Sequence, residues 1–71
     1  MSTQERAETI ASGLYQLAAD AGRLAGQCQA EGRTASNEQD YRRTEIWADM
    51  IRHVEDARVK LRKADDLTDL L

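Results

Sequence analysis

The sequence predicts an all-α protein, in which two antiparallel helices form a hairpin that pairs with a second copy into a four-helix bundle. Three observations predict this fold. The 71 residues include no proline, and 32% of them are charged, a composition typical of long surface helices. Apolar residues recur at alternating steps of three and four in both halves of the chain. The two periodic segments are similar in length and joined by a short connection, which favours antiparallel neighbours.

The first predicted helix covers residues 3–31. Ser2 and Glu5 have the spacing of a capping box, so the helix is expected to begin there. Gly32 can adopt the left-handed conformation that closes a helix C-terminus, which places the expected end near Glu31. The predicted seam, meaning the apolar stripe that faces other helices, is Ala7, Ile10, Leu14, Leu17, Ala21, Leu24 and Cys28.

The second predicted helix covers residues 37–64, after a polar connection at 33–35. Ser36 and Gln39 repeat the capping-box spacing. The residues 65–71 form an acidic, leucine-containing tail. The predicted seam of this helix is Trp47, Met50, Val54, Ala57, Leu61 and Ala64, flanked by Ile46 and Ile51. In the resulting hairpin, Ala7 is expected near Leu61 and Ala64, and Cys28 near Trp47.

A homodimer is expected because a lone hairpin covers only one side of each seam. Chains of this size bury about 60% of their unfolded surface, and a single cysteine cannot form an internal disulfide. A stripe of small residues around Gly22 and Gly26 indicates a further helix contact, because interior glycines cost about 1 kcal/mol each. The predicted dimer and core residues are Ile10, Leu14, Leu17, Ala18, Ala21, Gly22, Leu24, Ala25, Cys28, Trp47, Met50, Ile51, Val54 and Leu61.

No set of side chains predicts catalysis, a cofactor or a metal site. One histidine and one cysteine cannot supply a nucleophile, a base and an orienting group. Glu45, Asp49, His53 and Asp56 have a spacing that could hold a metal ion. Pairs such as Asp56 with Lys60, four residues apart, indicate a solvated charged face instead. Enzyme activity is therefore not expected.

Charge and hydropathy argue against nucleic acid and membrane as partners. The net charge is −3, whereas nonspecific DNA binding requires clustered cations. A basic run in residues 58–63 could contact phosphate, but acidic residues follow at 65–69. The longest mostly apolar stretch, residues 10–25, is interrupted by polar side chains, so no membrane span is expected. A single unpaired thiol fits the cytoplasm.

Two surfaces are candidates for contact with another protein: a thin apolar strip on the second helix and the leucines of the tail. The tail sequence LTDLL has the spacing of LxxLL peptides, which fill grooves on transcription regulators. The alternative is that these leucines extend the second helix and pack on the end of the bundle. The candidate partner-binding residues are Tyr41, Ala48, Val59, Leu67, Leu70 and Leu71.

In its size, its hairpin plan over residues 2–31 and 36–64, and its lack of catalytic residues, the chain resembles small helical accessory proteins encoded by phages. These proteins disable host regulators, and some are dimeric anti-activators of quorum-sensing transcription factors. The resemblance implies a homodimer that inhibits a regulatory protein such as a transcription activator, and it carries over no functional residue. The alternatives are a secretion-type chaperone or structural hairpin, and a small nucleic-acid-binding bundle.

Overall fold

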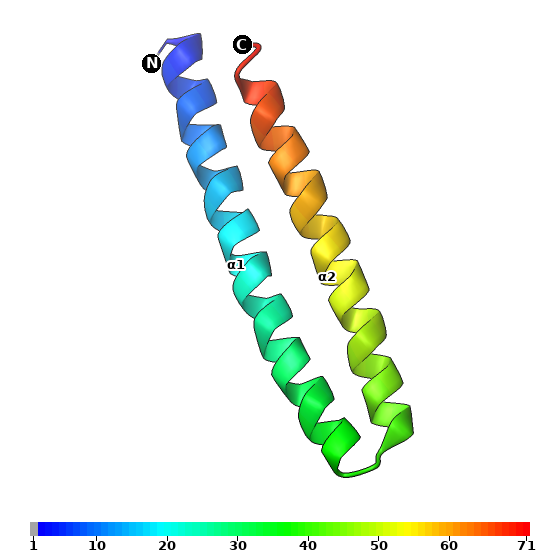
Figure 1. Cartoon of the computed structure of the whole chain (residues 1–71). Helices are drawn as coiled ribbons and strands as arrows, with labels where there is room; N and C mark the ends of the chain where they lie inside the picture. The colour runs from blue at the N-terminus through cyan, green and yellow to red at the C-terminus, as the bar shows by residue number, and fades with distance from the viewer. Residues whose placement is uncertain (1) are drawn as a thin grey trace.

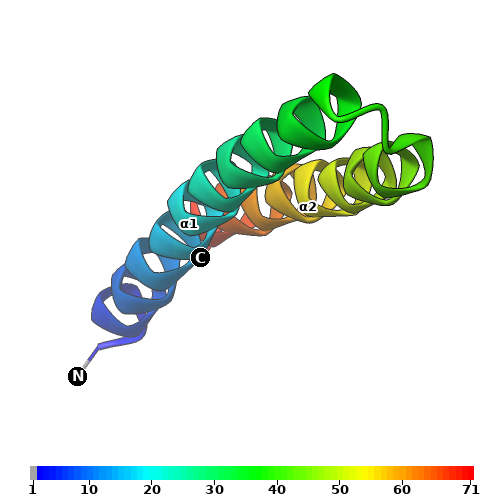
Figure 2. The same cartoon turned by 90° about the horizontal axis from the view of Figure 1, so that it is seen from below.

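The computed structural model describes residues 2–71 and consists of two helices. α1 spans Thr3–Asn37 and α2 spans Tyr41–Thr68. The helices run antiparallel, with both termini at one end of the hairpin and the turn at the other (Figure 1). They remain packed together in the view turned by 90° (Figure 2), and the hairpin measures 55 × 13 × 11 Å. The all-α hairpin predicted from the sequence is confirmed.

α1 begins as predicted but ends six residues later than expected. The Ser2 hydroxyl accepts a hydrogen bond from the Glu5 backbone N–H at 3.1 Å, which caps the helix. The predicted end near Glu31 was wrong, because Gly32 keeps a helical conformation and α1 continues to Asn37. A Cβ on Gly32 would stand 3.4 Å from the Trp47 Cβ. The missing side chain therefore lets the helices approach each other and does not close α1.

The turn between the helices uses a glutamine where the sequence suggested a glycine. Gln39 has a φ of 59°, which lies in the left-handed region. Its N–H donates to the Ser36 carbonyl at 3.0 Å, and the Asp40 N–H donates to the Ala35 carbonyl at 2.9 Å. These two bonds form a Schellman motif, which satisfies carbonyls left free at the end of a helix.

α2 begins and ends later than predicted. Ser36 lies inside α1, and the helix cap is Asp40, whose carboxylate accepts from the Arg43 N–H at 3.1 Å. The predicted start near residue 37 and the predicted end at Ala64 were therefore wrong. α2 includes residues 65–68 of the expected tail, and Asp69, Leu70 and Leu71 follow it in a tight turn.

The later turn changes which residues of the two helices lie side by side. Gly22 lies against Arg58, and Gly32 lies against Trp47. Ala7 lines a groove with Thr68, Asp69 and Leu71, so its predicted position beside Leu61 and Ala64 was wrong. Cys28 and Trp47 line one cavity near the turn, as expected.

The surface of α1 that faces α2 consists mainly of alanines. No residue larger than cysteine is buried among the described residues: the buried ones are Ala7, Ala18, Ala25, Cys28 and Ala35. Nine buried or half-buried positions of α1 follow steps of four and three, with half-buried Asp20 and Gly22 beside them: Ala7, Ala11, Leu14, Ala18, Ala21, Ala25, Cys28, Gly32 and Ala35. The matching positions of α2 are Thr44, Trp47, Ile51, Val54, Arg58, Leu61, Asp65 and Thr68. We call these two stripes the contact seam.

The contact seam is displaced by one residue from the predicted seam at every second position. Ala11, Ala18 and Ala25 replace Ile10, Leu17 and Leu24 on α1. On α2, half-buried Ile51, Arg58 and Asp65 replace Met50, Ala57 and Ala64, although Ala64 is itself half-buried. The distance between packed helices depends on the side chains at the contact, and alanine allows a close approach. The prediction that Ile10, Leu17, Leu24 and Met50 face the neighbouring helix within the hairpin was wrong.

Candidate protein-binding interface

Large apolar side chains on one side of the contact seam remain exposed. Ile10, Leu17, Leu24 and Met50 are 58%, 54%, 45% and 41% exposed. Each directly precedes a residue of the contact seam, and the same is true of Ala57 and Ala64. We call this set the apolar flank: Ile10, Leu17, Leu24, Met50, Ala57 and Ala64.

The two halves of the apolar flank lie on the same side of the hairpin. Residues that directly follow the contact seam meet between the helices: Tyr15 and Arg62 line one cavity, and Ser36 and Ala48 line another. Residues that directly precede the seam must therefore meet on the other side. On that side, a row of large side chains from α1 lies next to a row of mostly small side chains from α2.

The apolar flank continues beyond its six residues at both ends. Ile46 is 49% exposed and precedes Met50 by one helical turn, and Leu67 is 62% exposed and follows Ala64 by about one turn. Near the turn, an open cavity of about 480 Å³ is lined by Leu24, Cys28 and Trp47. The cavity therefore joins Leu24 of the apolar flank to Cys28 and Trp47 of the contact seam.

The opposite side of the hairpin carries isolated apolar residues among polar ones. Tyr15 and Tyr41 are each 70% exposed, and Ala48 and Val59 are also exposed. Between the helices on this side, a cavity of about 90 Å³ is lined by Leu14, Tyr15, Ala18, Ala19, Arg62 and Asp65. We call this side, with Tyr15, Tyr41, Ala48 and Val59, the mixed face.

The six predicted partner-binding residues do not form one surface. Tyr41, Ala48 and Val59 belong to the mixed face, whereas Leu67 borders the apolar flank. Leu71 lines a groove at the open end of the hairpin, and Leu70 is 80% exposed. The tail leucines therefore neither form a continuous docking helix nor extend the strip on α2.

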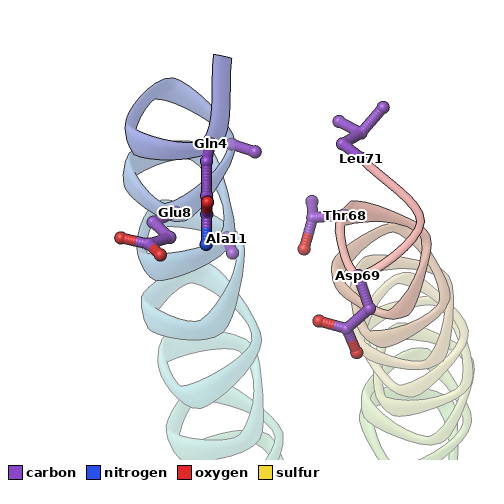
Figure 3. Close-up of a pocket in the computed structure, with 7 residues that line it drawn as sticks. Gln4, Glu8, Ala11, Thr68, Asp69 and Leu71 are labelled. Atoms are coloured by element: carbon purple, nitrogen blue, oxygen red, sulfur yellow. The ribbon is translucent and has the colours of Figure 1, made fainter. Parts of the chain in front are cut away.

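The groove at the open end has a volume of about 420 Å³ and is lined by both helices. Gln4, Glu8 and Ala11 come from α1, and Thr68, Asp69 and Leu71 come from the end of the chain (Figure 3). The Thr68 hydroxyl donates to the Asp65 carbonyl at 2.6 Å. The remaining polar groups that line the groove are carboxylates and an amide, which can form hydrogen bonds but do not pair a nucleophile with a base.

The basic run predicted around residues 58–63 is dispersed around α2. Arg58 lies in the contact seam against Gly22 and donates to the Glu55 carboxylate at 2.5 Å. Lys60 pairs with Asp56 at 3.0 Å, and Arg62 points to the mixed face. These cations do not form one patch. The Nε of Arg58 is buried and has no hydrogen-bond partner within residues 2–71.

Two of the four residues with metal-compatible spacing form ion pairs, and the four do not converge. Asp49 pairs with Arg52, and Asp56 pairs with Lys60. Within residues 2–71, no three His, Cys, Asp or Glu side chains are grouped closely enough to hold a metal ion.

Neither helix, over the residues that the structure describes, is apolar enough along its length to cross a membrane.

Comparisons of the chain with protein-family models, with curated proteins and with solved structures give no match. Function is therefore inferred from the surfaces of the hairpin itself. Among these surfaces, the apolar flank is the one that water solvates least well, because large apolar side chains follow each other along most of the hairpin.

Proposed function

We propose that this chain is a non-enzymatic protein-binding module that acts as a homodimer, with two hairpins packed flank against flank in a four-helix bundle. The observation that carries the proposal is the apolar flank, in which Ile10, Leu17, Leu24 and Met50 remain at least 41% exposed. Covering the exposed half of each side chain would contribute roughly 1 kcal/mol per residue. A second hairpin is a surface of matching length and polarity.

The exposed area of the hairpin supports the need for a partner. The hairpin exposes 5590 Å², whereas the size scaling for folded monomers gives about 4,500 Å² for a chain of 8.0 kDa. The excess is comparable to the roughly 800 Å² that each partner buries in a standard protein interface. Since the buried core consists of four alanines and a cysteine, the interface would supply the large apolar contacts that one hairpin lacks.

We also propose that the dimer binds a regulatory protein, such as a transcription activator, and inhibits it. The support for this target is the resemblance in size and plan to phage-encoded anti-activators. The mixed face, with Tyr41 and Val59, would stay exposed in the dimer and would occur twice. A secretion-type chaperone or structural hairpin is the alternative within the same class. The dispersal of Arg58, Lys60 and Arg62 disfavours a nucleic-acid-binding bundle.

Two substitutions on opposite sides of α1 test the interface. Leu17 and Tyr15 are both exposed in the hairpin, at 54% and 70%, so aspartate at either position would be solvated in a lone hairpin. Leu17→Asp would place two unpaired charges in a flank-to-flank dimer, and we expect it to abolish dimerisation and lower the helix content. Tyr15→Asp is the matched control and should leave both unchanged. The measurements are light scattering after gel filtration and circular dichroism.

Equal behaviour of the two variants, with both keeping the native mass and helix content, would contradict the proposed interface.

The proposed target requires a second experiment on the mixed face. Tagged protein is used to capture proteins from a lysate, which are then identified by mass spectrometry. The double variant Tyr41→Ala with Val59→Asp should lose the captured protein while its mass and helix content stay unchanged, and the variant lacking Leu70 and Leu71 tests the tail in the same way. Full capture by both variants would exclude these surfaces, and recovery of nucleic acid in place of protein would contradict the proposed class.

A further inference from the structure

We infer that the two copies associate with their turns at the same end, so that α1 of each hairpin packs against α2 of the other. This inference rests on the proposed dimer and specifies how the two flanks meet. A symmetric pair of hairpins can place one flank on the other in two ways. The turns lie together if the twofold axis runs along the hairpins, and they lie at opposite ends if the axis runs across them.

The register of the hairpin places large and small flank residues at nearly the same level. Gly22 lies against Arg58 and Gly32 lies against Trp47. These two contacts fix which residue of α2 lies at the level of each residue of α1. Counted from these two contacts, Leu17 is level with residues 62–63 and Leu24 with residues 55–56, so Ala64 and Ala57 lie one to two residues from those levels. With the turns together, the partner's Ala64 and Ala57 face Leu17 and Leu24, so that large side chains meet small ones.

The opposite arrangement matches the side chains less well. With the turns apart and the hairpins fully overlapped, α1 faces α1 of the partner, and Leu17 meets the partner's Leu24. On α2, Ala57 then meets the partner's Ala64. One half of the interface would hold the large side chains of α1 and the other half the mostly small ones of α2, which leaves a gap where the alanines meet.

Charges at the outer edge of the flank favour the same arrangement. Asp20 lies three residues after Leu17 and four before Leu24, and Lys60 lies three residues after Ala57 and four before Ala64. The two residues therefore border the flank at equivalent positions and at the same level. With the turns together, Asp20 faces the partner's Lys60 twice. With the turns apart, Asp20 faces the partner's Asp20 and Lys60 faces the partner's Lys60.

A distance measurement between spin labels distinguishes the arrangements. Arg42 is exposed beside the turn and makes no ion pair among the described residues. Arg42→Cys is labelled in a Cys28→Ala background, which leaves one label per chain. With the turns together, we expect a separation of three to four helix-packing distances, roughly 30–40 Å. With the turns apart, the separation approaches or exceeds the 55 Å length of the hairpin.

A label near the middle of α1 serves as the control. Ala19 lies on the mixed face beside Tyr15, so Ala19→Cys in the same background should give a separation of roughly 25–35 Å between copies in either arrangement. This separation from Ala19 with a long one from Arg42 would overturn the arrangement and leave the proposed dimer intact. The absence of any distance between copies at both positions would overturn the dimer as well.

Charge exchange at the flank edge provides an independent readout. With the turns together, Asp20→Lys should raise the dimer dissociation constant roughly tenfold, because two attractive pairs become repulsive. The double variant Asp20→Lys with Lys60→Asp should restore the native value. If the single variant dimerises as tightly as the native protein, Asp20 does not face the partner's Lys60, and the arrangement is contradicted.

Discussion

The Cβ of Trp47 lies 3.4 Å from the point where a Cβ on Gly32 would stand. A glycine in the middle of a helix is destabilising relative to alanine, and here the close approach of α2 accounts for it. The neighbouring Ala35 and Cys28 are buried on the same stripe. This contact lies between the two helices close to the turn.

Gly32→Leu should therefore destabilise the hairpin. The added side chain meets the Trp47 Cβ and forces the helices apart, at an expected loss of about 1–3 kcal/mol in the free energy of unfolding. Gly26→Leu is the matched control, because no atom lies within 4 Å of a Cβ at Gly26, and it should stabilise by about 0.8 kcal/mol through helix propensity. Urea unfolding followed by circular dichroism measures both, and similar stabilisation by both would show that α1 and α2 do not approach closely at Gly32.

The left-handed conformation of Gln39 predicts a stabilising substitution. Gln39 has a φ of 59°. For a residue with a Cβ, this conformation costs about 1 kcal/mol or more in free energy relative to a helical one, and glycine avoids most of this cost. Gln39→Gly should raise the free energy of unfolding by about 0.5–1 kcal/mol. Asn37→Gly, two residues earlier inside α1, should lower it by about 0.3 kcal/mol, because glycine is a poorer helix former than asparagine. Destabilisation by both changes would mean that the turn does not use Gln39 as its left-handed residue.

Arg58 is expected to weaken the contact seam. Its Nε is buried without a hydrogen-bond partner among the described residues, a state that costs about 1–3 kcal/mol. Arg58→Met keeps the aliphatic contact with Gly22 and should stabilise the protein by about 1 kcal/mol. Arg62→Met on the mixed face should change stability by less than about 0.5 kcal/mol. A clear loss of stability for Arg58→Met alone would show that the ion pair with Glu55 outweighs the buried Nε.

Cys28 should react slowly with thiol reagents in the native protein. Its side chain is buried in the contact seam, so labelling requires local opening of the hairpin. The double variant Gln27→Cys with Cys28→Ala moves the thiol to an exposed neighbouring position and should react at the rate of a free thiol. We expect the two proteins to be labelled at equal rates only after denaturant is added. Equal labelling rates without denaturant would mean that α2 does not cover Cys28.

The sequence allowed the hairpin to be predicted but not the rotation of its helices. Alternation of apolar residues at steps of three and four marks an amphipathic helix, and it fits two adjacent stripes on α1 equally well. Ala11, Ala18 and Ala25 repeat as regularly as Ile10, Leu17 and Leu24. The predicted seam contains the larger residues, whose burial yields more free energy. Within one hairpin, the closer approach over alanines prevails, and the leucines are left on the flank.

The turn was misplaced for a similar reason. Gly32 is the residue type most often found where a helix closes, whereas the structure uses Gln39 with Asp40 as the following cap. The Asp40 cap was a detectable signal, since aspartate is among the preferred helix-capping residues. Ser36 carries the same signal through its capping-box spacing with Gln39. The capping pattern does not rank these two positions, and the structure places Ser36 inside α1 and Asp40 at the start of α2.

The most direct test of the proposed interface is the mass of the native protein in solution. Sedimentation equilibrium over the micromolar concentration range, with helix content followed in parallel, reports whether the apolar flank finds a second copy. We expect a mass of about twice the 8.0 kDa of one chain, falling only on dilution and together with helix content. A constant mass of one chain at full helix content would show that a lone hairpin is stable with its flank in water, and it would contradict the dimer.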